Sequence, residues 1–375
     1  MMRSEDSRMK SDRNIIKPEQ ANMEVEQEDS GMKALCTAET SPEIRQLEKH
    51  LKIHYAGWAT EQRILTEDEM AELMAVHQPD ILLTSYDPIT RRVIESSSRL
   101  KLMVCTRANP VNVDDACLRE KGIPLSYAPE RNSDSTAEYT VAMMLSVMRR
   151  IPNAHHDLKT GLHTADEKPV QDTKAGLRRD ITWALGKDTP YVHYKGFQMK
   201  GRTLGIVGYG SIGRRVGEIC RAFGMKIMVY DPYLPEEEKD DAVFAGTLLE
   251  LAQEADVLTV HSKDTPETFQ MINREFLHHM KPSAFFINTS RGALVDEEAL
   301  VEALASRKIS GAALDVFESE PIWENHPLLK ECDNVVLTPH LAGATHDAIE
   351  NHTRQLVTDV THFLKREDLE FEYGG

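Results

Sequence analysis

The chain has 375 residues, 41% of them hydrophobic, which is enough for two separate cores and makes two domains the natural expectation. Its 44 Lys and Arg residues against 61 Asp and Glu residues give a formal net charge of −17 at pH 7. This acidic balance argues against a general surface for nucleic acid or for an anionic membrane. We therefore expect neither partner, and any anion-binding site must be local.

Residues 1–31 are polar and charged with almost no aliphatic pattern, and we expect a disordered N-terminal tail. The five cysteines are scattered and include no C-x-x-C pair, so neither a disulfide framework nor a zinc ribbon is indicated. No apolar run approaches the roughly 20 residues that are needed to cross a bilayer. These features lead us to expect a reduced, cytoplasmic protein.

From Lys33 to about residue 130 the pattern alternates between short apolar strands and helices. Strands are predicted at Ala34 to Thr37, Lys52 to Tyr55, Ile81 to Ser85, Leu102 to Cys105 and Ile123 to Tyr127. Helices are predicted from Ser41-Pro42, from Thr66 with Glu69 as a capping box, and over Val113 to Lys121. This βα succession predicts a small parallel-sheet domain, and the domain has no glycine fingerprint of its own.

Ser135 and Glu138 have the spacing of another capping box, and the helix that they predict runs to about Pro152 and is expected to cross between domains. The stretch from His155 to Phe197 that follows is polar and unusually long for a connection. Its ring-bearing residues Trp183, Tyr191, His193 and Tyr194 either pin a surface loop or contact substrate. The sequence leaves both interpretations open.

A nucleotide-binding turn is predicted where a short apolar strand feeds the spacing G-x-G-x-x-G at Gly208, Gly210 and Gly213, with a helix opening behind it at Ser211. Gly208 permits the sharp turn, Gly210 lets a pyrophosphate approach the backbone, and Gly213 lets helix and strand pack closely. The helix N-terminus then faces the anion. Glycines at this spacing also occur in ordinary loops, so the surrounding elements decide its meaning.

The next strand, Lys226 to Tyr230, ends in Asp231, which lies 18 positions beyond Gly213. An acid at this position accepts hydrogen bonds from the ribose hydroxyls and repels the additional phosphate of NADP, so NAD is the expected cofactor. The alternative is that Asp231 only ends a strand before Pro232, because Asp-Pro is common in turns.

Later strands at Val257 to His261, Ala284 to Asn288, Gly311 to Val316 and Val335 to Thr338 alternate with helices near Leu248, Arg274 and Asp296. This alternation predicts a doubly wound dinucleotide-binding domain. A long amphipathic helix, from about Thr345 to Lys365, ends the pattern and is expected to dock back on the first domain.

Three polar segments follow strands of this second domain, and they carry Arg291, Glu320 and His340. Ligands of open α/β sheets bind beyond the carboxyl ends of the strands, so an arginine, an acid and a histidine delivered there are expected to converge. Taken singly, each has an ordinary explanation as a surface ion pair, a loop acid or a core histidine. Together they predict a catalytic group.

With these motifs the chain resembles the D-isomer-specific 2-hydroxyacid dehydrogenase family, from about Lys33 to the C-terminus. The resemblance implies that Arg291, Glu320 and His340 are catalytic and that the glycine turn with Asp231 binds NAD. It extends the cofactor-binding set to residues that match by type: Ser211, Ile212, His261, Ser262, Thr289 and Asp315. It also implies a homodimer, formed through the nucleotide domain.

The fold class expected from the resemblance is α/β, with two doubly wound parallel-sheet domains. One is a flavodoxin-like substrate domain over residues 32–133, completed by 339–375. The other is an inserted Rossmann NAD-binding domain over 134–338.

The chemistry of hydroxyacid oxidation requires these residue types independently of the family. A base must take the hydroxyl proton while hydride leaves the carbon, and in reduction the same group returns the proton, which suits His340. Glu320 beside it would favour the imidazolium and fix which ring nitrogen faces the substrate. Arg291 can bind the substrate carboxylate and polarise the neighbouring carbonyl.

The sequence departs from the family in the first domain, where a Gly-x-Gly turn usually holds the substrate carboxylate and this chain has Thr106-Arg107-Ala108-Asn109-Pro110. Backbone N–H groups of Ala108 and Asn109 are expected to bind the substrate, with Arg107 as an added cation. The alternative for Arg107 is a surface salt bridge.

Two other functions remain open at this stage: an NAD(H)-responsive corepressor-like binding protein, which uses the same fold, and a phosphoglycerate-type dehydrogenase. No metal site is predicted, because the adjacent pairs His155-His156 and His278-His279 diverge on a helix and His346 with Glu350 fits a solvated face.

Overall fold

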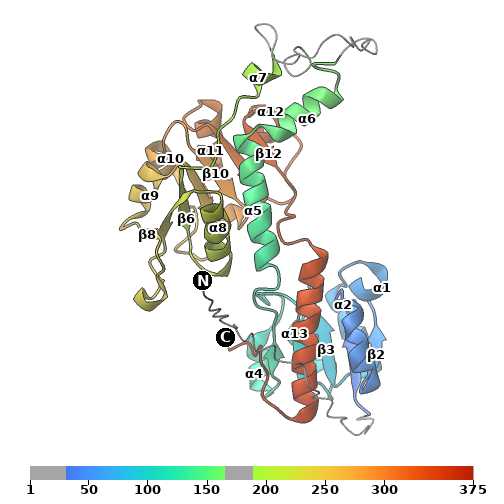
Figure 1. Cartoon of the computed structure of the whole chain (residues 1–375). Coiled ribbons are helices and arrows are strands. Elements are labelled where there is room, and N and C mark those ends of the chain that lie inside the picture. Colours follow the sequence, from blue (N-terminus) through green and yellow to red (C-terminus); the bar gives the residue numbers. More distant parts are fainter. Residues whose placement is uncertain (1–30, 165–188, 375) are drawn as a thin grey trace, which may run out of the picture.

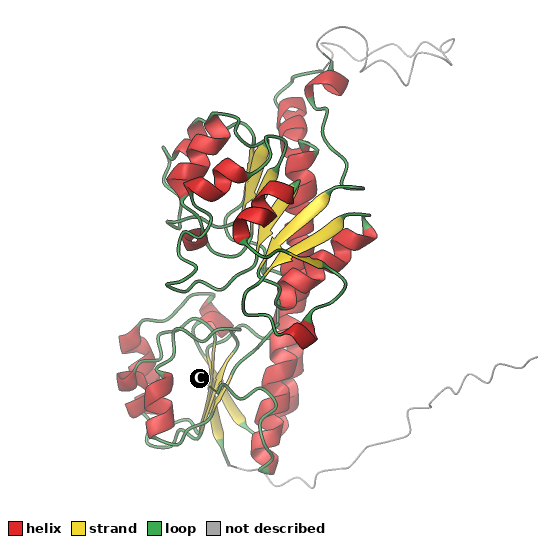
Figure 2. Cartoon of the chain, turned by 90° about the vertical axis from the view of Figure 1, so that its left-hand side faces the viewer, coloured by secondary structure: helices red, strands yellow, loops and turns green. Residues whose placement is uncertain are grey.

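Two parallel sheets, one above the other in Figure 2, organise the chain. The computed structural model describes residues 31–164 and 189–374. The first sheet has five strands in the order β2-β1-β3-β4-β5, and the second has seven in the order β12-β11-β10-β9-β6-β7-β8. The first order is that of flavodoxin-like sheets and the second extends the Rossmann order by one strand, so the predicted fold class is confirmed.

The first sheet and its helices are built from short segments close to those that the sequence predicts. The strands are β1 (Lys33–Cys36), β2 (Lys52–Tyr55), β3 (Ile81–Thr84), β4 (Leu102–Cys105) and β5 (Leu125–Ser126). The helices are η1 (Pro42–Lys49), α1 (Trp58–Glu61), α2 (Glu67–His77), α3 (Arg91–Glu95) and α4 (Asp115–Glu120). The predicted capping box is present, since the Thr66 side chain accepts from the Glu69 N–H and Glu69 accepts from the Thr66 N–H.

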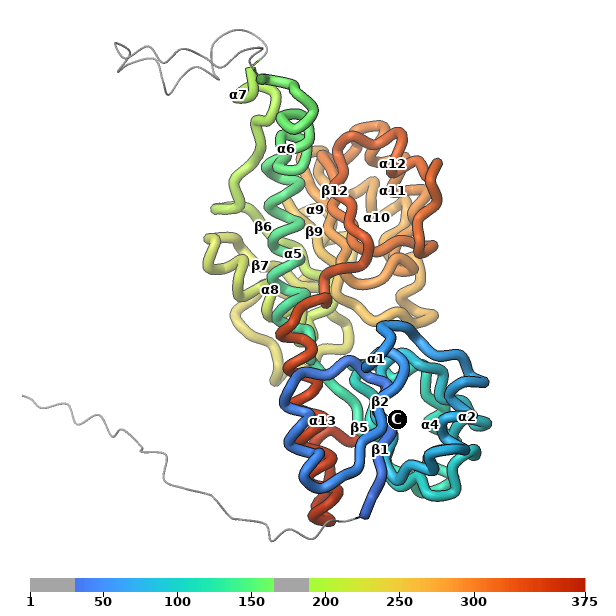
Figure 3. Tube along the Cα trace, turned by 90° about the vertical axis from the view of Figure 1, so that its right-hand side faces the viewer, coloured from blue at the N-terminus to red at the C-terminus, as the bar shows by residue number. Residues whose placement is uncertain are grey.

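The C-terminal helix α13 (His346–Lys365) packs on this first sheet rather than on the second (Figure 3). Leu356 and Val360 are fully buried in the same apolar cluster as Ala34 and Cys36 of β1. The chain after α13 then returns beside β5, where the buried carboxylate of Asp359 accepts hydrogen bonds from backbone N–H groups of the returning segment. We call this assembly the first lobe.

The second sheet forms the other lobe (Figure 1). Its strands are β6 (Thr203–Val207), β7 (Lys226–Tyr230), β8 (Val243–Phe244), β9 (Val257–Val260), β10 (Phe285–Asn288), β11 (Gly311–Leu314) and β12 (Val335–Leu337). Its helices are α8 (Ser211–Ala222), η3 (Glu236–Glu238), α9 (Leu248–Glu254), α10 (Arg274–His279), η4 (Gly292–Leu294), α11 (Glu297–Ala305) and α12 (Pro327–Lys330). The central strands β9, β10 and β11 are buried throughout, as parallel strands covered on both faces must be.

Helix α5 (Ser133–Met148) links the lobes, and its start corrects one prediction. The capping box expected at Ser135 and Glu138 is wrong, because the helix begins at Ser133 with Asn132 as an N-cap that makes no side-chain capping bond. The Ser135 hydroxyl instead lies 2.7 Å from the hydroxyl of Thr345, the N-cap of α13. A tertiary partner has therefore taken the side chain that local spacing assigned to the cap.

The long connection expected from His155 to Phe197 begins as a helix, α6 (Ile151–Lys159), and ends with a short helical turn, α7 (Pro190–His193). Tyr194 fixes the two ends to each other, because its hydroxyl donates to Asp157 at 2.6 Å. Trp183 and residues 1–30 lie outside the described residues.

All five cysteines are free thiols, four of them buried. Among the described helices, none is both long enough and apolar enough to cross a bilayer.

Candidate active site

The glycine turn adopts the backbone that the sequence predicts, between β6 and α8. Gly208 has a φ of +86°, and a Cβ there would lie 2.8 Å from the Ser262 N–H nitrogen. A Cβ on Gly213 would lie 2.3 Å from the carbonyl oxygen of Gly208, so only glycine permits helix and strand to approach this closely. A Cβ on Gly210 would meet nothing within 4 Å, which leaves room over the turn for a bound group. The geometry fits a pyrophosphate on a helix N-terminus.

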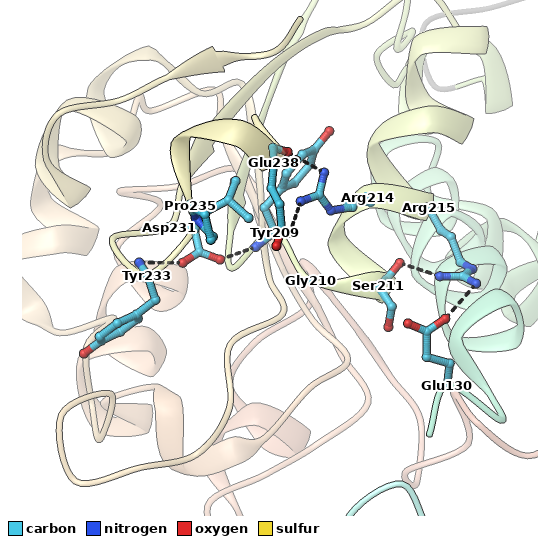
Figure 4. A pocket seen from close by; sticks show the side chains of 11 residues that line it. Glu130, Tyr209, Gly210, Ser211, Arg214, Arg215, Asp231, Tyr233, Pro235 and Glu238 are labelled. Atoms are coloured by element: carbon cyan, nitrogen blue, oxygen red, sulfur yellow. Dashed lines mark hydrogen bonds and ion pairs between the residues drawn. The ribbon is translucent and has the colours of Figure 1, made fainter. Parts of the chain in front are cut away.

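A pocket of about 450 Å³ opens beside this turn (Figure 4). Its lining residues are Glu130, Tyr209, Gly210, Ser211, Arg214, Arg215, Asp231, Tyr233, Leu234, Pro235 and Glu238. The two carboxylate oxygens of Asp231 accept hydrogen bonds from the backbone N–H groups of Tyr209, at 2.8 Å, and Tyr233, at 3.0 Å. These bonds fix the carboxylate at the position where the sequence predicts a ribose.

The charges that line the pocket are largely compensated. Arg214 is ion-paired with Glu238 at 3.0 Å, and Arg215 is ion-paired with Glu130 at 3.2 Å. Neither guanidinium is therefore available as an unshared cation for a 2′-phosphate, while Asp231 would repel one. The pocket accordingly suits NAD better than NADP.

Tyr209, the residue between the first two glycines, lines the pocket and holds the segment after β7 in place. It is fully buried and donates its hydroxyl proton to Asp240 at 2.7 Å, while Arg221 contacts both the hydroxyl and that carboxylate. Burial raises the pKa of the Tyr209 hydroxyl. The contact ties the segment after β7 to helix α8 and shapes the pocket from behind.

The other residues expected at the cofactor surround the same turn. The Ser211 hydroxyl lies 3.0 Å from the Ser133 hydroxyl, and Ile212 packs against the core beneath α8. Ser262 accepts the Ser290 hydroxyl proton through its carbonyl, and the Thr289 hydroxyl lies 2.7 Å from that of Thr140 on α5. Their direct contact with a cofactor stays a prediction.

His261 follows β9 directly and faces the glycine turn from the neighbouring strand. Its Nε2 lies 3.0 Å from the Thr259 hydroxyl, while its Nδ1 is buried and has no partner among the described residues. Burial lowers the pKa of His261 to about 3, so the imidazole is neutral at pH 7. A buried nitrogen without a partner is unusual and fits a position that a bound group completes.

His340 and Glu320 form the closest contact of the predicted catalytic set. The His340 Nδ1 lies 2.7 Å from one carboxylate oxygen of Glu320, and the other oxygen accepts the Phe317 N–H at 3.1 Å. Both side chains are partly exposed, at 50% and 37%. Since Glu320 occupies Nδ1, the Nε2 nitrogen of His340 is the one left to act on another molecule.

Asp315 holds the segment that carries His340. Its carboxylate, at the end of β11, accepts hydrogen bonds from the Thr338 hydroxyl at 2.6 Å and from the N–H groups of Leu341 and Ala342 at 2.9 and 2.8 Å. The Asp315 carbonyl accepts the His340 N–H at 2.7 Å. His340 has a φ of +56°, a left-handed conformation that costs about 1–2 kcal/mol in a residue with a side chain. The bonds to Asp315 offset this strain. The predicted contact between Asp315 and the cofactor stays a prediction.

Arg291 lies exposed in the loop after β10, and its guanidinium donates to the Ser290 carbonyl at 2.6 Å. The Asn288 side chain clamps this loop, donating to the Arg291 carbonyl at 2.9 Å and accepting the Ser290 N–H at 3.0 Å. A Cβ on Gly292 would lie 1.9 Å from the Phe317 carbonyl oxygen, so the loop packs directly on the segment that leads to Glu320. Among the described residues, no carboxylate forms an ion pair with Arg291.

The predicted substrate residues lie on the first lobe, where the chain leaves β4. Arg107 donates to the Asn112 side chain at 3.2 Å and lies over the Tyr86 ring, 5.0 Å from its centroid. The backbone N–H groups of Ala108 and Asn109 donate to no other described residue. No described hydrogen bond joins these three residues to Arg291, Glu320 or His340. Within the predicted catalytic set, whose three residues are all described, the structure joins only His340 and Glu320 directly.

Several residues that shape the site were missed by sequence reasoning. Arg214 and Glu238 line the pocket, Tyr86 supports Arg107, and Asn132 packs against Gly343, where a Cβ would lie 2.2 Å from the Asn132 amide nitrogen. Only Arg214, one residue after the third glycine, has a local signal. Within the described ranges no group of three or more metal-ligating side chains is found.

Comparison with known proteins matches these features. A sequence profile described as the NAD-binding domain of D-isomer specific 2-hydroxyacid dehydrogenases matches residues 141–342. YoaD of Bacillus subtilis (strain 168), whose name assigns it to the 2-hydroxyacid dehydrogenases, is 33% identical over 89% of this chain and 90% of YoaD. A glyoxylate reductase of Thermococcus litoralis is 35% identical over 79% of this chain and 83% of the reductase.

One longer relative and one solved structure are also similar to this chain. The D-3-phosphoglycerate dehydrogenase of Methanocaldococcus jannaschii is 38% identical over 76% of this chain, and the match spans 49% of that longer enzyme. Among solved structures, the TT0316 protein of Thermus thermophilus has a TM-score of 0.73 and 29% identity, covering 91% of this chain and 99% of that one.

The carboxylate of Asp231 generates a prediction about cofactor choice. We expect NADH to be preferred over NADPH, and Asp231→Ala to reduce the ratio of their kcat/KM values by about tenfold or more, which is about 1.4 kcal/mol. The matched control is Glu237→Ala, which removes an exposed acid of the same segment that does not line the pocket. Equal use of both cofactors by the native protein would contradict the assignment.

Proposed function

Because the chain belongs to the D-isomer specific 2-hydroxyacid dehydrogenase family, we propose that it interconverts a D-2-hydroxyacid and its 2-oxoacid with NAD, using His340 and Glu320 as an acid–base pair. The observation that carries the proposal is the 2.7 Å contact between His340 and Glu320, at the carboxyl edge of the sheet that binds the dinucleotide. A histidine in contact with a carboxylate can both take and return a proton near neutral pH.

His340 moves the proton of the substrate hydroxyl. In oxidation its Nε2 takes this proton, and in reduction it returns the proton to the carbonyl oxygen, while bound NAD supplies the hydride chemistry. Glu320 contacts Nδ1 and stabilises the imidazolium, the form of His340 that exists after it takes the proton in oxidation and before it returns the proton in reduction. Asp315 holds the backbone that carries the ring, since its carbonyl accepts the His340 N–H and its carboxylate accepts the Leu341 N–H.

Arg291 orients the substrate on the second lobe. Its guanidinium has the planar fork that fits a carboxylate, and it would also polarise the neighbouring carbonyl oxygen as negative charge develops there. On the first lobe, the N–H groups of Ala108 and Asn109 would donate to the same carboxylate, and Arg107 would add a cation. A substrate held between two lobes in this way is oriented by both.

Two assignments that accompany the proposal concern the whole protein. We propose a homodimer formed through the second lobe, because Ile151, Leu158 and Leu162 on and after α6, with Tyr191 and Val192 of α7, expose apolar side chains there. A light-scattering mass equal to one 42.4 kDa chain would contradict it. A cytoplasmic location is proposed with it, on the expectation of reduced cysteines.

A phosphoglycerate-type dehydrogenase is the second candidate. It is favoured by the relatives of that name, although this chain spans about half their length. A corepressor-like binding role is the third, and turnover on any 2-oxoacid would argue for the enzymatic function. A panel of 2-oxoacids, sugar-derived and phosphorylated ones included, followed by NADH absorbance, separates these functions.

Replacement of the proposed acid–base group tests the mechanism. His340→Asn should lower kcat by about 10³-fold or more, since positioned proton transfer contributes about 10²–10⁴-fold, while the dissociation constant of NADH stays within about threefold. The matched control is His346→Asn, an exposed histidine at the start of α13. Near-normal turnover of His340→Asn would refute the assignment.

Arg107 gives a prediction about the substrate. Arg107→Ala should raise the KM for the preferred oxoacid by about tenfold or more, equivalent to about 1.4 kcal/mol, with little effect on NADH affinity. Arg119→Ala, which removes an exposed arginine paired with Asp115 on the same lobe, serves as the control. Unchanged kinetics across the oxoacid panel would show that Arg107 is only structural.

A further inference from the structure

Two arginines share one tyrosine at the carboxyl edge of the first sheet. Tyr86 follows β3, and Arg107, which follows the neighbouring strand β4, lies over its ring, 5.0 Å from the centroid. Arg131, from the segment between β5 and α5, donates to the Tyr86 hydroxyl at 3.3 Å. Both arginines are half-buried, and Tyr86 is 44% exposed. The two positive charges therefore flank a single phenol that is open on one side.

A buried histidine positions Arg131 without neutralising it. The Nε2 of His352, on α13, lies 2.8 Å from the Glu39 carbonyl oxygen and must donate to it, so Nδ1 is the acceptor for the Arg131 guanidinium at 3.3 Å. Burial lowers the pKa of His352 to about 4, with Arg131 adding to the effect, so the ring is neutral at pH 7. A neutral acceptor holds the guanidinium in place and leaves its charge intact.

Arg107 is likewise held by neutral partners, which are the side-chain amide oxygen of Asn112 and the Tyr86 ring. Among the described residues, neither Arg107 nor Arg131 forms an ion pair with a carboxylate. Five other arginines of this lobe are ion-paired, namely Arg63, Arg91, Arg92, Arg99 and Arg119, whereas Arg45, Arg354 and Arg366 also have no ion pair among the described residues. In a chain of net charge −17, two neighbouring uncompensated guanidiniums are best explained by an anion that they bind.

Two acids close to the cluster are already engaged elsewhere. The Asp87 carboxylate is buried and accepts the hydroxyl protons of Thr37 and Thr84 together with the Leu65 N–H. Glu130, which precedes Arg131, is ion-paired with Arg215. Neither acid therefore competes with an incoming anion for the two guanidiniums.

The cluster adjoins the proposed active site. Asn132, the residue after Arg131, packs against Gly343, three positions beyond His340. Ser133 reaches the glycine turn, where its hydroxyl lies 3.0 Å from that of Ser211. Tyr86 also stands beyond β3, at the point between β1 and β3 where the strand order of the first sheet reverses, which is where open α/β sheets bind ligands.

We propose that Arg107 and Arg131 form a subsite for a second anionic group, so that the preferred substrate is a 2-oxoacid with a distal carboxylate or phosphate. The inference rests on the proposed function, in which Arg291 and the N–H groups of Ala108 and Asn109 take the carboxylate next to the carbonyl. The two first-lobe cations are then left for the other end of the molecule. Arg131 thereby determines specificity, and His352 positions it.

The test compares substrates that differ only in the distal group. Oxaloacetate is paired with 2-oxobutyrate, and 3-phosphohydroxypyruvate with hydroxypyruvate, and kcat/KM is measured with NADH. The native enzyme should prefer the member with the distal anionic group in at least one pair by about tenfold or more, and that pair identifies the group as carboxylate or phosphate. Arg131→Gln should reduce this preference by about tenfold or more, mainly through KM, while kcat/KM for the monoanion changes less than about twofold.

Two variants protect the interpretation. Arg131→Lys should restore part of the preference, because it keeps the charge, and Arg354→Gln, which removes an exposed arginine of α13, should leave both substrates unaffected. Equal losses on both members of a pair in Arg131→Gln, or a native enzyme without preference for either substrate with a distal anionic group, would overturn the subsite while leaving the dehydrogenase function intact. Absence of turnover on every oxoacid would overturn both proposals.

Discussion

The proposed chemistry depends on one buried carboxylate. Asp315 directly follows β11, accepts three hydrogen bonds from the segment 338–342 on its carboxylate and accepts the His340 N–H on its carbonyl, so it fixes the backbone that carries the imidazole. Without these bonds, the left-handed backbone of His340 would have no compensation for its strain. The contact with Glu320 then selects the ring nitrogen that faces outward. The structure thus holds His340 twice, with Asp315 fixing its backbone and Glu320 fixing its ring.

The lobes meet where the start of α5 and the start of α13 contact each other. Asn132 packs against Gly343, and the Ser135 and Thr345 hydroxyls lie 2.7 Å apart, so the start of α5 and the start of α13 are joined. This junction lies next to His340 on one side and Arg131 on the other. A site shared by two sheets needs such a connection, because neither sheet alone presents both the acid–base pair and the first-lobe cations.

Most of the fold could be predicted from the sequence because parallel sheets leave a strong local signal. Buried apolar strands, the three glycines of the turn and polar segments after several strands were all visible. The spacing of Gly208, Gly210 and Gly213, together with the strand before it, the helix behind it and Asp231 after the next strand, predicted the dinucleotide site. The predicted cap at Ser135 is wrong because a hydroxyl 210 positions away competes for the same side chain. The positioning of Arg131 by His352, 221 positions away, was invisible for the same reason. Long-range polar partners leave no periodicity to detect.

The most direct measurement is a crystal structure of the protein with NADH and oxalate, an unreactive analogue of a 2-oxoacid. We predict that an oxalate oxygen lies within hydrogen-bond distance of the His340 Nε2, that Glu320 remains on Nδ1, and that Arg291 contacts an oxalate carboxylate. Oxalate bound between the lobes with His340 turned away from it, or bound without Arg291, would contradict the proposed mechanism.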